Sequence, residues 1–165
     1  MYIYKKKSKN NKKQKGVKYM EDLIKDLNSL LADLNVFYRK LQNYHWNIIG
    51  KDFFVIHEKL EEYYDGINEQ IDEIAEHILM LGAEPLGTMQ DYLNTTCIAE
   101  AKNEKIKDCE MFENVIKDLE ILLKKVTDIK KKADDSNNYA TSSLMDNYIS
   151  DYIKKLWMLN QMMSK

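Results

Sequence analysis

Four polar side chains recur on a segment that otherwise has the apolar periodicity of a core helix. His57 and Glu61 are four residues apart. Asp72 and Glu76 repeat that spacing further along the chain. At about 100° per residue, all four fall within about 100° of one another around a helix. Side chains at positions i and i+4 lie about 5 to 6 Å apart, so each pair can bind one metal ion. The spacing predicts two half-sites for a metal on one helical face.

The two pairs are too far apart to bind the same ion within one chain, because about 22 Å of straight helix separates them. An antiparallel copy of the helix would bring the first pair of one chain against the second pair of the other. The two-fold axis then passes near Gly66, where the missing side chain lets two backbones approach closely. Each such interface would hold two identical sites, as two-fold symmetry requires.

A fifth ligand is predicted from the end of the preceding helix, where His45 lies beside the second helix. A mixed set of imidazole and carboxylate groups suits iron, with zinc or manganese as competitors. The competing interpretation is a solvated acidic face, because Asp65, Asn68 and Glu69 lie near the same stripe. The residues alone leave both interpretations open.

The elements that must position these residues are all helices. The chain has 165 residues, 44% of them hydrophobic, with only five glycines and one proline, which favours a single helical domain with a real core. Apolar residues at intervals of three and four predict four long helices and, after Thr88, one short helix. The long helices are expected at about 21–46, 53–81, 99–132 and 139–163. We therefore predict an all-α fold, a ferritin-like four-helix bundle over 20–165, with a short extra helix in the long connection between helices two and three.

The first 19 residues have a different composition and are predicted to form a disordered basic tail. Residues 1–20 contain eight lysines and no acidic residue, so the rest of the chain carries a net charge of about −10. Many copies of such a tail in an oligomer would bind DNA phosphates without sequence preference. The alternatives are a merely solubilising extension or an upstream translation artefact, because Met20 directly precedes the helical pattern.

Location is predicted from what the sequence does not contain. No apolar run approaches the roughly 20 residues of a membrane span, and no apolar stretch of a secretory signal follows the basic start. We expect a cytoplasmic protein with no membrane partner, associated with the nucleoid if the tail binds DNA. Cys97 and Cys109 form no C-x-x-C pattern and are expected to be free thiols.

A family resemblance adds to these inferences. The run HWNIIGKDFFVIHEKLEEYYDGINEQIDEIAEHILMLGAEPLGT resembles the Dps family, the DNA-binding proteins from starved cells, which are ferritin-like mini-ferritins. The ending KKLWMLNQMM is also similar to the last helix of that family, and the resemblance extends over residues 23–163. The positions that match the family pattern are His45 with Trp46, His57, Asp72 and Glu76.

The resemblance implies an enzyme, a ferroxidase, that stores iron and protects DNA from oxidative damage. Such proteins assemble as hollow dodecamers, oxidise Fe(II), usually with hydrogen peroxide, at sites across a two-fold interface, and keep ferric mineral inside. Carried over by position, the ligands from one subunit are His45, His57 and Glu61. The partner subunit would supply Asp72 and Glu76. Residue 61 is a departure, because the family usually has aspartate there.

Two other classes of protein compete with this interpretation. A ferritin that builds its di-iron centre inside each bundle uses Glu-x-x-His on two helices, and this chain has no such motif. The second class is a non-enzymatic DNA-compacting protein that acts through its lysine tail. His77 is expected to be a surface histidine, and Trp46 to be either a quencher of radicals near the site or an ordinary packed aromatic.

Overall fold

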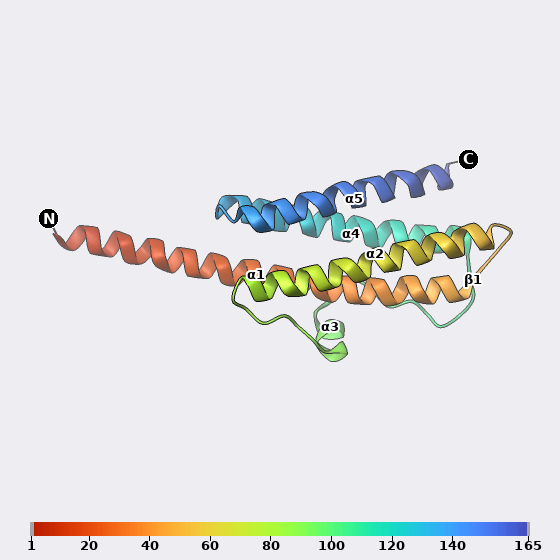
Figure 1. Ribbon diagram of the computed structural model, residues 1–165, viewed down its shortest axis with the longest axis horizontal. Helices are drawn as coiled ribbons and strands as arrows, with labels where there is room; N and C mark the ends of the chain where they lie inside the picture. Colours follow the sequence, from red (N-terminus) through yellow and green to blue (C-terminus); the bar gives the residue numbers. More distant parts are fainter. Residues whose placement is uncertain (1, 165) are drawn as a thin grey trace.

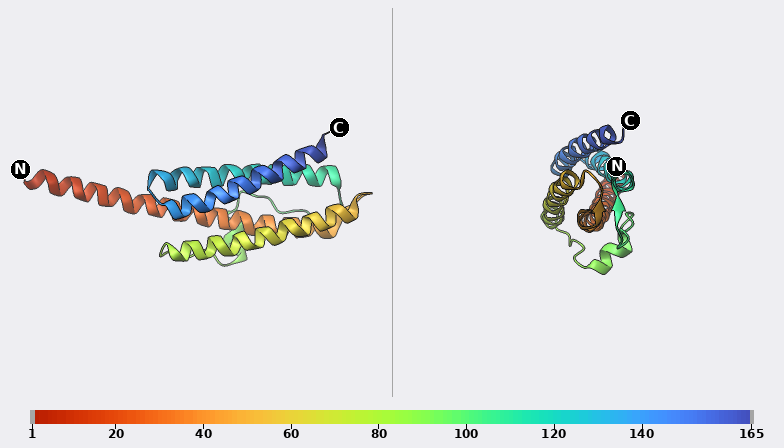
Figure 2. Two further views of the ribbon diagram at one scale, coloured as in Figure 1. Left: turned by 45° about the horizontal axis from the view of Figure 1, so that its top comes forward. Right: turned by 90° about the vertical axis from the view of Figure 1, so that its right-hand side faces the viewer.

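The computed structural model describes the backbone of residues 2–164 and the side chains of residues 16–164. It is an all-α bundle built from two antiparallel helical hairpins, α1 with α2 and α4 with α5 (Figure 1). The helices are α1 (Tyr2–Asn47), α2 (Phe53–Met80), α3 (Met89–Thr95), α4 (Asp108–Asp135) and α5 (Tyr139–Met163). The end-on view in Figure 2 shows the four long helices around a common core, with α3 outside it. The predicted fold class is confirmed.

Apolar side chains at helical spacing fill the core between the four long helices. On α1 they occur every three or four residues, and they are fully or almost fully buried. The buried set on α1 includes Leu23, Leu27, Leu30, Leu34, Phe37 and Leu41. On α2 the buried face carries Ile56, Leu60, Ile67, Ile74 and Ile78, which leaves the opposite face of α2 to solvent. The three predicted carboxylate ligands, Glu61, Asp72 and Glu76, lie on that outward face.

The start of α1 differs from the sequence-based expectation. The helix begins at Tyr2, whereas we predicted a disordered tail over residues 1–19 and a helix from about 21. Lysine and glutamine are good helix formers, and extending an existing helix needs no new nucleus, so the stretch continues the helix of the bundle. The first described hydrogen bond from α1 to another helix is made by Tyr19, whose hydroxyl donates to Asp135 at 3.3 Å. Before it, α1 extends beyond the bundle (Figure 1).

The connection between α2 and α4 is long and is anchored by one buried carboxylate. Asp33 of α1 is fully buried and accepts hydrogen bonds from the Thr96 hydroxyl at 2.8 Å and the Cys97 backbone N–H at 2.6 Å. Lys125 of α4 forms an ion pair with the same carboxylate. The short helix was predicted correctly: Thr88 caps α3 by accepting from the backbone N–H of Asp91. Within the described chain both cysteines are free and exposed.

A two-residue parallel sheet pairs the segments that flank the hairpins. The strands are β1 (Ile48–Ile49) and β2 (Ile106–Lys107), and no sequence signal predicted them. The third long helix, α4, begins at Asp108, directly after β2, whereas we predicted that it begins near residue 99. Asp52 occupies the position before α2 but makes no side-chain capping bond. At the other end, Gly82 adopts a left-handed φ of 79° just after α2, as a helix-ending glycine should.

His77 is buried, so its assignment to the surface was wrong. Its Nε2 lies 2.7 Å from the Thr141 hydroxyl at the start of α5. Burial lowers the pKa of His77, and the nearby Glu73 carboxylate opposes that shift. The same seam between α2 and α5 contains the Tyr152 hydroxyl, which donates to Gln70 at 2.6 Å. These bonds fix α2 along its inner side, so that its outer face is held rigidly.

Among residues 2–164 we find no helix with the length and apolar character that a membrane crossing requires.

Candidate metal centre

Two of the predicted ligands, His45 and His57, are locked together by reciprocal hydrogen bonds. The Nδ1 of His45 donates to the backbone carbonyl of His57 at 2.8 Å, and the Nδ1 of His57 donates to the carbonyl of His45 at 2.9 Å. The two rings stack with their centroids 3.6 Å apart. Because a carbonyl can only accept, each Nδ1 must carry the proton. In the neutral rings the free lone pair is therefore on Nε2, the atom that can bind a metal.

Aromatic neighbours hold the two imidazoles in place. Phe53, in the first turn of α2, stacks on His57 with a centroid distance of 5.0 Å. Tyr64 meets His45 edge-on at 5.4 Å. The pair is thus clamped on both sides, which fixes the direction of each ring before any metal binds. Sequence spacing did not reveal this clamp, because it depends on the turn between α1 and α2.

The three predicted carboxylate ligands, Glu61, Asp72 and Glu76, are all exposed on the outer face of α2. The helix runs without interruption from Phe53 to Met80, so the pair nearer its start and the pair nearer its end stay about 22 Å apart. Within the described part of the chain, no three histidine, cysteine or carboxylate side chains converge on a point that could hold a metal ion. The structure therefore brings His45 of α1 against His57 of α2, with Glu61 one turn further along α2, and places Asp72 and Glu76 in another region of α2.

The outer face of α2 also exposes large apolar side chains at both ends of the stripe. Phe54 is 79% exposed and Leu79 is 58% exposed. At about 100° per residue, both lie in the same angular range as the carboxylates. Along this stripe of α2, each pair of predicted ligands therefore lies between the polar centre of the helix and an exposed apolar residue near one of its ends. Exposed apolar residues at both ends of a polar stripe are typical of a surface that a partner covers.

Two further sequence-based inferences can be compared with the structure. Trp46 is 56% exposed, so within one chain it is not an ordinary packed aromatic. Around Gly66 there is open space, since a Cβ built there would meet no heavy atom within 4 Å. Among the described residues nothing requires a glycine at this position, and close approach by a second chain stays a prediction.

One carboxylate has a neighbour that the sequence did not point to. The pKa of Tyr64 is raised by burial and by the negative charge of the nearby Glu61 carboxylate. Tyr64 also packs edge-on against Tyr38 of α1, with centroids 5.9 Å apart. In the sequence Tyr64 resembles a core aromatic; the only signal was its position three residues after Glu61, at a distance where helical side chains meet.

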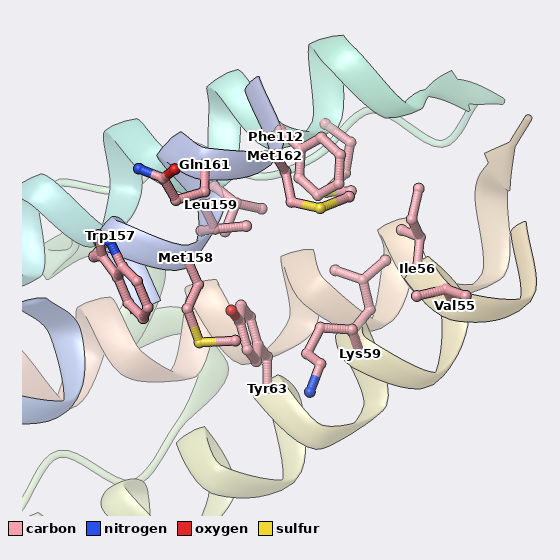
Figure 3. A pocket seen from close by; sticks show the side chains of 13 residues that line it. Val55, Ile56, Lys59, Tyr63, Phe112, Trp157, Met158, Leu159, Gln161 and Met162 are labelled. Carbon is pink, nitrogen blue, oxygen red and sulfur yellow. The ribbon is translucent and has the colours of Figure 1, made fainter. Parts of the chain in front are cut away.

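An apolar groove lies away from these residues. It has a volume of about 300 Å³ and lies between the first half of α2, the start of α4 and the end of α5 (Figure 3). Its lining includes Tyr63, Phe112, Trp157, Met158 and Met162. It contains none of the five predicted ligands, so the metal centre and the groove are separate features.

Known proteins with similar sequences show the class to which this chain belongs. The sequence model of the ferritin-like domain family matches residues 24–165. A DNA protection during starvation protein of Porphyromonas gingivalis is 39% identical over 145 residues, covering 87% of this chain and 89% of the relative. DNA protection during starvation protein 2 of Bacillus anthracis is 36% identical, covering 88% of this chain and 99% of the relative.

Solved structures agree in fold and length. The crystal structure of a Dps protein from Vibrio cholerae, described as ferritin-like and diiron-carboxylate, superposes with a TM-score of 0.86 at 37% identity and covers 89% of this chain and 92% of that one. A Dps protein from Bacillus brevis gives a TM-score of 0.86 at 31% identity, with coverage of 89% and 98%. This chain belongs to the Dps family of ferritin-like proteins.

Proposed function

We propose that this protein oxidises Fe(II), preferentially with hydrogen peroxide, at sites shared between two copies of the chain, and stores the ferric product inside a hollow oligomer. The observation that carries the proposal is the reciprocal pair of hydrogen bonds between His45 and His57. That pair leaves Nε2 as the free ring nitrogen of the buried His45 and the half-buried His57, with the exposed Glu61 carboxylate one turn from His57 on α2.

The register of the shared site follows from the spacing on α2. If α2 packs antiparallel against a second copy with its axis between residues 66 and 67, Glu61 faces Asp72 of the other copy, and His57 faces Glu76. The same register places Phe54 against Leu79 of the other copy. The exposed apolar residues would then cover the outer end of each site and exclude water from it. This agreement between ligands and apolar flanks supports the proposed dimer.

The ligand types suit the proposed reaction. Carboxylates are hard ligands that favour Fe(III) over Fe(II), and imidazoles bind both. Two Fe(II) ions supply the two electrons that reduce one hydrogen peroxide: two Fe(II), one hydrogen peroxide and two protons give two Fe(III) and two waters. No hydroxyl radical is released in that balance. An acidic protein body with a net charge of about −10 outside the tail would attract cations toward these sites.

The larger assembly and the biological role rest on the family. Relatives are named for DNA protection during starvation, and we propose the same role here, carried out by a cytoplasmic dodecamer built from two-fold dimers. Removing Fe(II) and peroxide together protects DNA because these two reagents generate hydroxyl radical when they meet in solution.

The test is anaerobic loading with Fe(II), addition of hydrogen peroxide, and measurement of ferric absorbance. We expect fast oxidation of two Fe(II) per peroxide in the unmodified protein, and its loss in the double variant Asp72→Ala, Glu76→Ala. The matched control is Glu120→Ala, Asp128→Ala, which removes two exposed carboxylates of α4 and should leave the rate unchanged. Equal slow rates in all three proteins would refute the proposal and leave the stripe as a solvated acidic face.

A second activity, binding of DNA, is favoured by the position of the lysine-rich start of α1. The helix carries this segment beyond the bundle, where it can reach a partner without disturbing the fold (Figure 1). We expect deletion of residues 1–19 to abolish a DNA mobility shift while leaving Fe(II) oxidation intact. For the full chain, we expect DNA binding to weaken steeply as the salt concentration rises from about 50 to about 200 mM. Loss of both activities on deletion would contradict this separation of roles.

A further inference from the structure

A continuous row of aromatic rings runs from the outer face of α2 to its seam with α1. In order, the rings belong to Phe54, Phe53, His57, His45, Tyr64 and Tyr38. Neighbouring centroids along the row lie 3.6 to 5.9 Å apart. Phe54, at the outer end, is 79% exposed, whereas His45 is buried. Both predicted imidazole ligands therefore lie inside a packed row, and Phe53 is the ring between them and the exposed end.

His57 is the imidazole that depends most on this row. His45 is 7% exposed, while His57 is only half-buried. The last torsion of a histidine side chain, χ2, has a broad energy profile, so the side chain alone does not fix the tilt of its ring. The hydrogen bond from Nδ1 of His57 to the His45 carbonyl, at 2.9 Å, restrains one edge of the ring. A ring held at one edge can still tilt about that bond, so its tilt is set by the rings packed on its faces.

Two rings stack on His57. The His45 imidazole lies at a centroid distance of 3.6 Å and an angle of 19°, and the Phe53 ring lies at 5.0 Å and 25°. Phe53 is four residues before His57, a spacing at which helical side chains meet. It is itself supported, because it packs against the core and meets the ring of Phe54 edge-on at 5.5 Å. His57 is thus held between a buried imidazole and a supported phenyl ring.

The tilt of His57 matters for metal binding because the free lone pair of Nε2 lies in the plane of the ring. Tilting the ring therefore moves the point at which a metal ion can be bound. A ring that is free to tilt must be ordered when the metal binds, which lowers affinity, and a ring already held at the right tilt avoids that cost.

We propose that Phe53 is a positioning residue of the metal centre: the flat face of its ring sets the tilt of the His57 imidazole and so directs Nε2 before a metal binds. This inference rests on the proposed function and adds to it a residue that has no metal-binding atom of its own. Contacts between aromatic rings typically change an equilibrium constant by about 2-fold to 10-fold, which is the size of effect expected here.

If Phe53 acts through its flat face, then the shape of the side chain matters more than its volume. Leucine and methionine occupy much of the same space without a flat face, so they should weaken metal binding. Tyrosine keeps the flat face and should preserve it. A phenylalanine that only filled space would be replaced by methionine at least as well as by tyrosine, because methionine adds no polar group.

The experiment is an anaerobic titration of the assembled, full-length protein with Co(II), followed by its visible absorption. The unmodified protein is compared with Phe53→Leu, Phe53→Met and Phe53→Tyr. The matched control is Phe112→Leu, which changes a half-buried phenylalanine of α4 that lines the apolar groove, away from the predicted ligands. Urea denaturation of the two leucine variants shows whether they lose a similar amount of packing.

We expect Phe53→Leu and Phe53→Met to weaken Co(II) binding about fivefold, and Phe53→Tyr and Phe112→Leu to change it less than about twofold. Unchanged affinity in Phe53→Leu and Phe53→Met would overturn the role of Phe53. So would an equal loss in Phe53→Tyr, or a loss as large in Phe112→Leu. If Phe53→Leu does not assemble, Phe53→Met against Phe53→Tyr gives the same comparison; failure of both apolar variants to assemble would make Phe53 a residue of the fold and overturn the inference.

The proposed function and this inference fail in different ways. If the unmodified protein neither bound Co(II) nor oxidised Fe(II), the proposed function would be wrong and the inference with it. If it oxidised Fe(II) without binding Co(II), the half-saturating Fe(II) concentration would be compared instead, with the same expected ratios. Fe(II) oxidation that is insensitive to every substitution of Phe53 would overturn the inference alone.

Discussion

Mixing two inactive variants should restore activity if each metal site is divided between two chains. One variant lacks the ligands near the start of α2 (His57→Ala, Glu61→Ala), and the other lacks those near its end (Asp72→Ala, Glu76→Ala). Each homodimer has two damaged sites. In a mixed dimer one site carries all four substitutions and the other carries none. The pairs cannot complete each other within a chain, because an uninterrupted α2 keeps them about 22 Å apart.

The expected magnitude follows from two-fold symmetry. Random exchange of equal amounts gives mixed dimers in about half of the population, and each has one intact site of two, so about a quarter of all sites recover. The assay is peroxide-dependent Fe(II) oxidation after the variants are unfolded together and refolded. We expect about 25% of the unmodified rate from a mixture whose components are inactive alone.

Exchange between chains is checked with a second mixture. Unmodified protein is refolded with a variant that carries all four substitutions. Without exchange the rate is about half that of the unmodified protein, and with full exchange it falls to about a quarter, because every mixed dimer then has two damaged sites. Demonstrated exchange in this mixture, together with no recovery in the first, would refute the shared site.

Three further predictions concern the dimer surface and the buried polar groups. Phe54→Ser should shift the oligomer toward monomer in analytical ultracentrifugation, because burying Phe54 against Leu79 of a second copy contributes about 1.5 to 3 kcal/mol at each of two contacts; an unchanged oligomer would contradict the register. The unfolding free energy should fall between about pH 7 and pH 5, and His77→Leu should make that fall smaller. The pKa of His77 is lowered by burial in the folded protein, so the unfolded chain binds the proton first as pH falls, and stability is lost below the unfolded pKa. Parallel pH profiles of urea denaturation for the two proteins would count against this. Asp118 forms an ion pair with Lys40 at 2.6 Å, and both side chains are buried. Asp118→Leu should therefore lower the free energy of unfolding, measured by urea denaturation, by about 3 to 5 kcal/mol, and adding Lys40→Met should restore most of that loss. No recovery in the double variant would mean that the cost is steric.

Local patterns predicted much of the bundle correctly. The apolar period gave α2 and α5 almost to the residue, and the Thr88 cap located α3, because these signals lie within the segment they define. The pairing of β1 with β2 was missed, because the two strands are far apart in the sequence and each is only two residues long. The start of α1 was also missed, because a polar composition argues against burial and does not by itself prevent a helix from continuing.

For the site, spacing identified the type and face of the ligands but not what fixes them. His77 was assigned to the surface because it follows Glu76, yet one residue is about 100° of helix, enough to turn its ring toward α5 and Thr141. The bonds between His45 and His57 depend on how the turn joins α1 to α2. Neither partner could be inferred from periodicity, which describes one helix at a time.

The proposed division of each site between two chains would have a consequence for iron oxidation. A single chain holds His45 and His57 in place by their reciprocal hydrogen bonds, whereas its Asp72 and Glu76 are exposed far along α2 from His57. In the proposed site, Fe(II) could meet a half-site on a monomer, but two of the three hard carboxylates that favour Fe(III) would arrive only with the second chain. Under the proposed function, oxidation would therefore be restricted to the assembled protein. If assembly also forms the proposed enclosure, ferric product would be generated only where there is a compartment to receive it.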